Sequence, residues 1–508
     1  MITINQLLQI TPQDNVAVAL TNLTPGTAVL PNGDSITLNE NVPQGHKVAL
    51  IDIAAGHPII RYGYSIGNAK NAISRGQWVH SHNLATGLHG KLEYQYQPDT
   101  TALNKTVTSN SDQIPTFLGY RRSDGQVGIR NEIWIINTVG CTNKQSERLA
   151  YLAQERFKNQ IQAGRIDGIF AYSHPYGCSQ LGEDHTNTQK LLAGLVKHPN
   201  AAGVLVVGLG CENNQMKDFK NFITGYDPNR VKFMVLQDVA DEFETGMELI
   251  GELVEQAAQF KQEPIPVSKL KIGLKCGGSD GFSGITANPL VGSISDKLVG
   301  LGGTSILSEV PEMFGAETIL MNRAKNAAIF DKIVALVNDF KDYFIRNGQE
   351  VYENPSPGNK DGGITTLEEK SLGCTQKGGS TAVVDVLKYG EQVKTHGLNL
   401  LQGPGNDIVS TSALTAAGAH LILFTTGRGN PMGAPVPTLK ISTNSGLNAK
   451  KPNWIDFNAG QLLEGTSMPE LTEQFFSHIL AIASKQVLAK NEINGYRDIA
   501  IFKNGVTL

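Results

Sequence analysis

The chain has 508 residues, of which 40% are hydrophobic and 18% charged, with a formal net charge of −4. This length exceeds what one hydrophobic core supports, so we expect two to four domains in a globular protein. The charge gives no electrostatic basis for binding nucleic acid or an anionic membrane, and no apolar run is long enough to span a bilayer.

The cysteine content and the first residues indicate the compartment. Five cysteines are too few for a disulfide framework. The first stretch, MITINQLLQITPQDN, lacks the basic and apolar regions of a signal peptide. We therefore expect a cytoplasmic protein whose thiols are free for chemistry or for metal.

Residues 1–89 predict a small β domain. Short β-type segments (NVAVAL, TAVLPNGDSITL, KVALIDIAAG, PIIRYGYSIGNA) alternate there with turn signals. The domain ends in WVHSHNL, where His80 and His82 would share one side of an extended segment and could hold one metal ion. Such pairs also arise by chance. Residues 90–115 are polar and aperiodic, which predicts a linker.

From residue 117 onward, strand-like runs alternate with amphipathic helical stretches, as in a parallel α/β sheet. The connection KQEPIPVSKL predicts a boundary between a middle α/β domain, residues 116–262, and a C-terminal Rossmann-like α/β domain, residues 263–508. Strand after strand ends in a glycine-rich loop. Open α/β sheets bind ligands outside the carboxyl ends of their strands, so we expect these loops to converge on one crevice.

One such loop, SHPYGCSQLGEDHTNT (residues 173–188), concentrates His174, Cys178 and His185 with two acids. His174 directly follows its strand, where a histidine is well placed for proton transfer. His185 fits the start of a helix equally well. Each of the five cysteines has a glycine beside it, although a free cysteine is commonly just a small buried hydrophobe. The sequence contains no CxxC pair, so the cysteine spacing does not favour a structural zinc site.

Acids and lysines extend the set of candidates. Glu309 follows a strand in LSEVPEMFGAE, and Asn406 lies in QGPGND. Lys377 lies in ENPSPGNKDGGITTLEEKSLGCTQKGGS, which has no apolar period and is therefore interpreted as a long functional loop. GRGNPMG and GCTQKGGS both miss the nucleotide-binding patterns, and no GxSxG elbow is present, which disfavours nucleotide enzymes and serine hydrolases.

Taken together, these motifs resemble the altronate and galactarate dehydratase family. The resemblance rests on DNVAVAL, GHKVAL, YGCSQLGEDH, VGLGCENNQ, CGGSDGFSGITANP, EVPEMFGAE, YENPSPGNKDGGITTLEEKSLGCTQK, PGND and FKNGVTL, spread over nearly the whole chain. It implies an N-terminal β-clip (SAF-like) domain, a linker, a dimerising α/β domain and a C-terminal Rossmann-like domain. It also implies a homodimer that dehydrates a sugar acid with a divalent metal, Fe2+ first and Mn2+ as an alternative. For altronate the product would be 2-keto-3-deoxy-gluconate.

Such a dehydration needs a base for the proton beside the carboxylate and a Lewis acid for the resulting enediolate. Iron(II) accepts imidazole, carboxylate and thiolate ligands together. For proton transfer we expect His174 or His185, with Lys377 as a rival. The expected substrate contacts are Arg130, Arg428 and Asn406, because arginine captures carboxylates in a bidentate manner. The expected metal ligands are Cys178, Glu309, His80 and His82.

Three alternatives stay open at this point. The substrate could be galactarate, which carries a second carboxylate. Three of the five cysteines, on separate loops, could hold an iron–sulfur cluster whose iron takes the leaving hydroxyl. From another class, the chain could be a non-catalytic sugar-acid binding protein. The density of His, Cys and acidic residues at strand ends favours an enzyme over the last of these.

Overall fold

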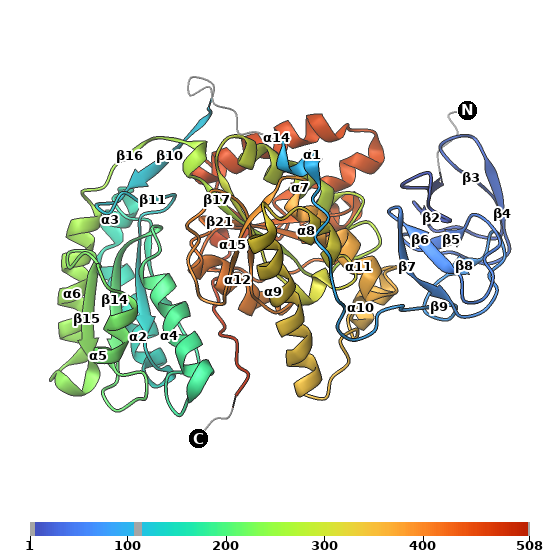
Figure 1. The fold of residues 1–508 in the computed structure, drawn as a ribbon. Coiled ribbons are helices and arrows are strands. Elements are labelled where there is room, and N and C mark those ends of the chain that lie inside the picture. Colours follow the sequence, from blue (N-terminus) through green and yellow to red (C-terminus); the bar gives the residue numbers. More distant parts are fainter. Residues whose placement is uncertain (1–5, 106–113, 506–508) are drawn as a thin grey trace.

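The computed structural model describes residues 6–105 and 114–505. Figure 1 shows three bodies in a row, with the C-terminal domain (yellow to red) between the N-terminal domain (blue) and the middle domain (green). Within the described ranges, no helix is both long and apolar enough to cross a bilayer. The predicted fold class, a small β domain followed by α/β domains, is confirmed.

The N-terminal domain is built from short antiparallel strands whose apolar side chains form two clusters, one of which also includes Ala316 and Leu372 of the C-terminal domain. The strands are β1 (Leu7–Leu8), β2 (Val16–Ala19), β3 (Gly26–Val29), β4 (Ser35–Leu38), β5 (Lys47–Ala49), β6 (Pro58–Arg61), β7 (Tyr64–Ala69), β8 (Trp78–Val79) and β9 (Leu84–Ala85). β8 ends at Val79, and a turn follows in which the backbone N–H of Asn83 donates to the carbonyl of His80 at 3.0 Å. The expectation that His80 and His82 share one side of an extended segment is therefore wrong, because the strand stops before them.

The segment after the N-terminal domain crosses the C-terminal domain before it reaches the middle domain (Figure 1). It carries one short helix, α1 (Thr100–Leu103). Two tyrosines anchor it, since Tyr94 Oη donates to Glu317 and Tyr96 Oη donates to the carbonyl of Ala324, both at 2.5 Å. Residues 106–113 of the predicted linker lie outside the described residues. The described part is a strap packed on the C-terminal domain.

The middle domain contains a four-stranded parallel sheet in the order β13-β12-β14-β15. Helices α2 and α6 cover one face and α4 covers the other, which explains why β12 and β14 are continuous apolar runs. An antiparallel sheet in the order β11-β10-β16 joins the entry and the exit of the domain. The elements are β10 (Thr116–Arg121), β11 (Val127–Gly128), β12 (Glu132–Asn137), α2 (Asn143–Arg156), α3 (Lys158–Gln162), β13 (Gly168–Tyr172), α4 (Gly182–Val196), β14 (Ala201–Gly208), α5 (Met216–Phe219), β15 (Val231–Val235), α6 (Glu242–Ala257) and β16 (Gln262–Pro266).

The C-terminal domain contains a seven-stranded parallel sheet in the order β19-β20-β18-β17-β21-β22-β23. The strands are β17 (Lys271–Cys276), β18 (Thr304–Leu307), β19 (Val383–Leu387), β20 (Gly397–Leu401), β21 (Leu421–Thr426), β22 (Thr438–Ser442) and β23 (Phe457–Asn458). The helices are α7 (Ala287–Gly300), α8 (Glu317–Asn322), α9 (Ala327–Arg346), α10 (Pro357–Asp361), α11 (Leu367–Cys374), α12 (Asp407–Ala416), α13 (Ser445–Lys450), α14 (Met468–Ala483) and α15 (Lys490–Ile493). The chain reverses its direction of strand addition between β17 and β21, which makes this a switch point of the kind that binds ligands.

Two findings correct the expectations about loops. The glycine-rich loops do not converge on one crevice, because the strands they follow belong to two separate sheets. The stretch around Lys377 is not a long loop, because it folds into α10, α11 and the 3-10 turn Thr375–Gly378. Every residue of α11 is buried. A helix covered on all sides has no solvent-exposed face, so its polar and apolar residues need not alternate with an amphipathic period.

The middle and C-terminal domains share a core where α4 packs against α12. Gly194 permits this close approach, since a Cβ atom at that position would lie 2.6 Å from the carbonyl oxygen of Ala416. The end of the described chain also joins the two domains, because the backbone N–H groups of Asn504 and Gly505 donate to the carboxylate of Asp184 at 2.7 and 2.6 Å.

Candidate functional site

Two buried cysteines and one buried glutamate meet at the carboxyl edge of the seven-stranded sheet. The Sγ atoms of Cys276 and Cys374 lie 3.4 Å apart. Glu312 Oε2 lies 3.1 Å from the first sulfur and 3.2 Å from the second. All three donor atoms fall within 4.8 Å of one another, a spacing suited to a single metal ion.

Three different elements bring these side chains together. Cys276 is the last residue of β17, the strand at the switch point. Glu312 lies in the 3-10 turn Val310–Met313 that follows β18, and this turn begins at Glu309 in a left-handed conformation with φ of 69°. Cys374 ends the buried helix α11. Because β17 and β18 are adjacent parallel strands, their carboxyl ends deliver Cys276 and Glu312 to the same edge.

Lysine side chains surround the group. Lys370 Nζ lies 2.8 Å from Glu312 Oε1. Glu309 is held by Lys377 Nζ at 3.0 Å and also pairs with Lys275. The side chains of these ion pairs are at most 8% exposed. Buried charges of this kind persist only when they are paired, so the lysines fix the two carboxylates in place.

Burial and neighbouring charges set the protonation states of this group. Burial would raise the pKa of Glu312, but the ammonium groups of Lys370, Lys275 and Lys377 hold it well below its usual range. The hydrogen bond with Cys276, together with burial, raises the pKa of the Cys374 thiol well above its ordinary value. Without a bound cation, the neighbouring carboxylate and burial therefore disfavour ionisation of the thiols to thiolates. A divalent ion would favour the thiolate form, and the sulfur and oxygen donors suit iron(II) better than magnesium.

The N-terminal domain completes the surroundings of the group. Glu369, on α11, forms buried ion pairs with Lys47 Nζ at 2.8 Å and with Arg61. Burial opposes ionisation of Glu369, but these two cations lower its pKa to about 2. On the same helix, Glu368 accepts hydrogen bonds from Thr86 Oγ1 at 2.9 Å and from Gly87 N at 2.7 Å. The N-terminal domain is thus docked on the helix that carries Cys374.

Polar groups line two hollows that share Cys374. One hollow, between the N-terminal and C-terminal domains, includes Arg61, Ser279, Asp280 and Lys370. The other includes Ser308, Glu309, Glu312 and Lys377. The Oγ atoms of Ser279 and Ser308 are buried and have no hydrogen-bond partner among the described residues. Unsatisfied buried hydroxyls cost free energy, so each of these two can form a hydrogen bond with a ligand atom that reaches it.

Four of the expected site residues lie at this edge of the sheet. Glu309 and Lys377 line the same hollow as Glu312 and Cys374, with Glu309 committed to ion pairs with lysines. Arg428 follows β21 and is exposed, and its backbone N–H donates to the carbonyl of Gly278 at 3.0 Å. Asn406 is the N-cap of α12, where its side chain accepts from Val409 N at 3.2 Å.

The other expected residues lie elsewhere. The guanidinium of Arg130 is buried in an ion pair with Glu492, at 2.7 Å. In the middle domain, Nε2 of His174 lies 2.9 Å from the carbonyl of Asn137 and its Nδ1 accepts from Tyr176 N, so both ring nitrogens are engaged. Burial lowers the pKa of His174. His185, on α4, also belongs to the middle domain, and burial lowers its pKa too.

The two histidines of the N-terminal domain lie against the C-terminal domain. Nε2 of His80 lies 2.9 Å from the carbonyl of Lys360, and the ring stacks on those of His46 and Trp78. His82 is exposed and packs at an angle against Trp78. Neither histidine belongs to a group of three donors close enough to hold one ion among the described residues.

Three exposed cysteines lie on the loops that follow adjacent strands of the middle sheet. Backbone hydrogen bonds tie these loops together, from Gly140 N to the carbonyl of Tyr176 at 2.8 Å and from Asn214 N to that of Gly177 at 2.9 Å. The cysteines are Cys141, Cys178 and Cys211. Their sulfur atoms do not lie within 4.8 Å of one another, so Cys178 is not part of a ready-made site for a single ion.

Sequence reasoning placed Cys276 at a strand end and Cys374 in a glycine-rich loop before a helical stretch, but it did not select them, Glu312 or Lys370 as site residues. The available signal was the position of Cys276 directly after a strand. No comparable signal marked Cys374, because its helix was interpreted as a loop.

Comparison with known proteins covers almost the whole chain. Three family models match, described as Altronate/galactarate dehydratase SAF domain (residues 5–87), D-galactarate dehydratase/Altronate hydrolase, second domain (residues 119–258), and D-galactarate/Altronate dehydratase, C-terminal (residues 267–507). An altronate dehydratase of Escherichia coli K12 is 53% identical over 99% of this chain and 100% of its own length. One from Bacillus subtilis 168 is 50% identical, with 99% of each chain covered. A galactarate dehydratase (L-threo-forming) of Escherichia coli K12 is 32% identical over 96% of this chain and 95% of its own.

Proposed function

The chain belongs to the altronate/galactarate dehydratase family, and on this premise we propose that it is a hydro-lyase that converts D-altronate to 2-keto-3-deoxy-D-gluconate and water. Its higher identity to the two altronate dehydratases than to the galactarate dehydratase favours altronate as substrate. The observation that carries the proposal is the buried group of Cys276, Glu312 and Cys374 at the ligand-binding edge of the sheet. The similarity to these enzymes over nearly the whole chain favours an enzyme over the alternative of a non-catalytic sugar-acid binding protein.

The reaction takes a proton from C2, beside the carboxylate, and expels the C3 hydroxyl, which leaves with a proton as water. The enol that results tautomerises to the 2-keto acid. When bound, a divalent ion, Fe2+ in our proposal and Mn2+ as the alternative, supplies Lewis-acid stabilisation of the enediolate. Cys276, Glu312 and Cys374 are the residues that would hold it, and three protein ligands leave room for substrate oxygens.

The surrounding residues have separate tasks in this proposal. Lys377 is the proton-transfer residue, because it lines the hollow beside Cys374 and Glu312. Burial would lower its pKa, but the cysteines and glutamates around it hold that pKa well above the ordinary value, so Lys377 acts as the acid that protonates the leaving hydroxyl. Lys370 is a positioning residue that orients the Glu312 carboxylate through its 2.8 Å ion pair. The unpartnered hydroxyl of Ser279 accepts or donates to the sugar hydroxyls, and Arg428, exposed at the rim, receives a carboxylate.

Serine substitutions test the metal group. Cys276→Ser and Cys374→Ser proteins, prepared anaerobically with iron(II) and thiol, should lose bound iron. Their keto-deoxy acid formation from altronate should fall by more than about a hundredfold, since loss of even an outer-shell partner typically costs 10–100-fold. Cys141→Ser removes an exposed cysteine of the middle domain and serves as the matched control. Full iron content and turnover in both buried-cysteine variants would exclude this assignment.

The alternative of an iron–sulfur hydro-lyase has one specific observation in its favour. Cys141, Cys178 and Cys211 lie on neighbouring loops that are hydrogen-bonded to each other, and a cluster is larger than a single ion. Under this alternative, serine variants of these three residues lose acid-labile sulfide, visible absorption and activity, while the Cys276→Ser protein keeps them. A colourless, sulfide-free and active protein removes the alternative.

Substrate, assembly and compartment need their own measurements. Altronate should outperform galactarate, galactonate and mannonate in a panel read as keto-deoxy acid with iron(II) present. A preference for galactarate would favour the alternative that the chain is a galactarate dehydratase. We also propose a cytoplasmic homodimer, supported by the free cysteines and by the family resemblance. Light scattering should then give about twice the chain mass of 54.7 kDa.

A further inference from the structure

A second hollow lies between the middle and C-terminal domains, far from the metal group. Its residues include Gln126, Lys269, Lys271, Lys394, His396 and His420, and its cavity volume is about 200 Å³. Lys271 is the first residue of β17 and Cys276 is the last, so the hollow and the cysteine lie at opposite edges of the same sheet. Five steps along a strand separate them by about 17 Å.

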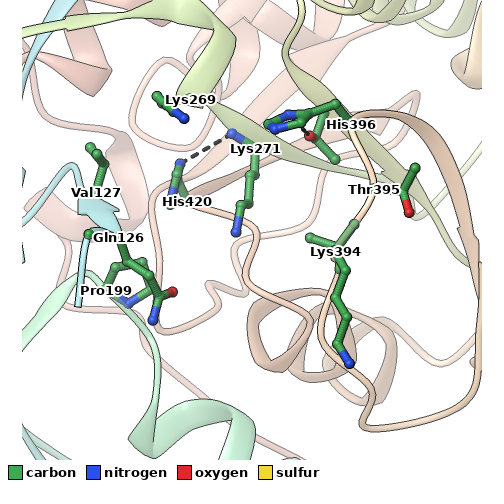
Figure 2. A pocket seen from close by; sticks show the side chains of 12 residues that line it. Gln126, Val127, Pro199, Lys269, Lys271, Lys394, Thr395, His396 and His420 are labelled. Carbon is green, nitrogen blue, oxygen red and sulfur yellow. Dashed lines mark hydrogen bonds between the residues drawn. The ribbon is translucent and has the colours of Figure 1, made fainter. Parts of the chain in front are cut away.

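The hollow is lined by cations without matching acids. Figure 2 shows Lys271 between His420 on one side and Lys394 and His396 on the other. Among the described residues, no carboxylate oxygen lies within 4.0 Å of the ammonium groups of Lys269, Lys271 or Lys394. Burial, followed by the charge of Lys269, lowers the pKa of Lys271.

The nearest acid does not neutralise this cluster. Asp124 lies close enough to raise the pKa of Lys271 slightly, but its carboxylate pairs with Arg230 at 3.2 Å. A further cation also lies near Lys394, since burial, followed by the charge of Lys394, lowers the pKa of Lys197. Lys271 is half-buried, whereas Lys269 and Lys394 are exposed, so water screens part of their mutual repulsion and a bound anion would relieve the rest.

A buried imidazole adds a directed hydrogen-bond donor. Nδ1 of His420 accepts from Lys271 N at 3.1 Å, which leaves the proton of the neutral ring on Nε2. The ring is 1% exposed, and Nε2 has no hydrogen-bond partner among the described residues, although the backbone of Val127 is near. Buried donors are normally satisfied, and because the backbone of Val127 makes no well-formed hydrogen bond with this N–H, the group can donate to a ligand in the hollow.

We infer that this hollow binds a small oxyanion carrying two or more negative charges, held by Lys269, Lys271 and Lys394 and oriented by the Nε2–H of His420. Phosphate and di- or tricarboxylates share the required chemistry, because both present several oxygens to ammonium and N–H donors. The hollow has walls from both domains, namely the β10–β11 turn and Pro199 on one side and Lys271 on the other. An anion there would therefore also strengthen the contact between the domains.

Calorimetry on the full-length protein tests the inference, with inorganic phosphate and citrate as separate probes and with chloride at equal ionic strength as the blank. Either probe should bind saturably and raise the thermal unfolding midpoint. Lys271→Met should weaken binding by roughly tenfold or more, because a hydrogen bond to a charged group contributes about 1.5–3 kcal/mol. The exposed Lys394→Met should weaken it too, and it provides a second variant whose folding is not in question.

The control variant is Lys144→Met, which removes the same charge from a side chain that is 86% exposed on α2. Altronate dehydration without added anion should be unchanged in all three variants, so this test is independent of the proposed activity. Phosphate binding without citrate binding identifies a phosphate site, and the reverse identifies a carboxylate site. Absence of saturable binding of both probes, or equal weakening by Lys144→Met, overturns the inference.

Discussion

Replacement of Glu369 by glutamine should loosen the N-terminal domain from the rest of the protein. The wild-type carboxylate is paired with Lys47 and Arg61, and all three side chains are at most 1% exposed. Glutamine keeps the shape but removes the charge, which leaves two buried cations without a counter-ion. Breaking a buried pair in this way typically costs about 3–5 kcal/mol.

The pKa of Glu369 gives an independent magnitude. Its two cationic partners lower the pKa to about 2. A shift of roughly two units from the ordinary value corresponds to about 3 kcal/mol, which agrees with the first figure. If this free energy is lost from docking alone, the undocked population rises roughly a hundredfold or more.

Urea unfolding, followed by tryptophan fluorescence, measures the loss, since Trp78 lies in the docked domain next to the interface. Limited proteolysis of the strap (residues 90–105) detects undocking directly. Glu368→Gln is the matched control on the same helix, because its amide oxygen can still accept from Gly87 N and no ion pair is removed. A Glu369→Gln protein as stable and as resistant to protease as wild type, or an equal loss in the control, would refute the reasoning.

Three further outcomes follow from the structure. Since the pKa of Glu369 is lowered on folding, its stabilising contribution is present above pH ~4.3 and lost as the pH falls toward 2, so the urea midpoint should fall over that window in wild type and much less in the glutamine variant. Diamide, which takes two electrons from two thiols, should join Cys276 to Cys374, whose sulfurs are 3.4 Å apart, and abolish iron uptake until thiol is added; unchanged iron binding after diamide contradicts this. Gly194→Ala should cost about 1–3 kcal/mol in urea unfolding, because the new methyl group meets a carbonyl of α12 at 2.6 Å, whereas Gly251→Ala, whose methyl group meets only a ring atom at 3.7 Å, should be neutral or stabilising.

The sequence was sufficient for the order and type of the domains. Turn-separated β segments and alternating α/β runs are recognised from local residue patterns, and the structure contains the corresponding strands and helices. The sequence pattern did not predict which strands share a sheet, because the apolar runs before Cys178 and Cys276 have the same pattern but belong to different sheets. This is why one crevice was expected where the fold has two separate sheet edges.

The site was only partly predictable for a related reason. Glu309 and Lys377 were selected and line a hollow together with Glu312 and Cys374, but Cys374 lies on a helix whose complete burial removes any periodic signal. His174 was selected for its place after a strand, yet both its ring nitrogens bond to the backbone of its own domain. Which polar side chain is exposed to a ligand and which satisfies the backbone depends on tertiary contacts.

The buried ion pairs of Lys47 and Arg61 with Glu369 can form only late in synthesis of the chain. The partners are 322 and 308 residues apart in the chain. At a synthesis rate of about 5–20 residues per second, roughly 15–60 s pass between the emergence of the two cations and that of their carboxylate. During this interval the N-terminal domain depends on its own β core. The two cations stay hydrated on its surface until α11 has been made.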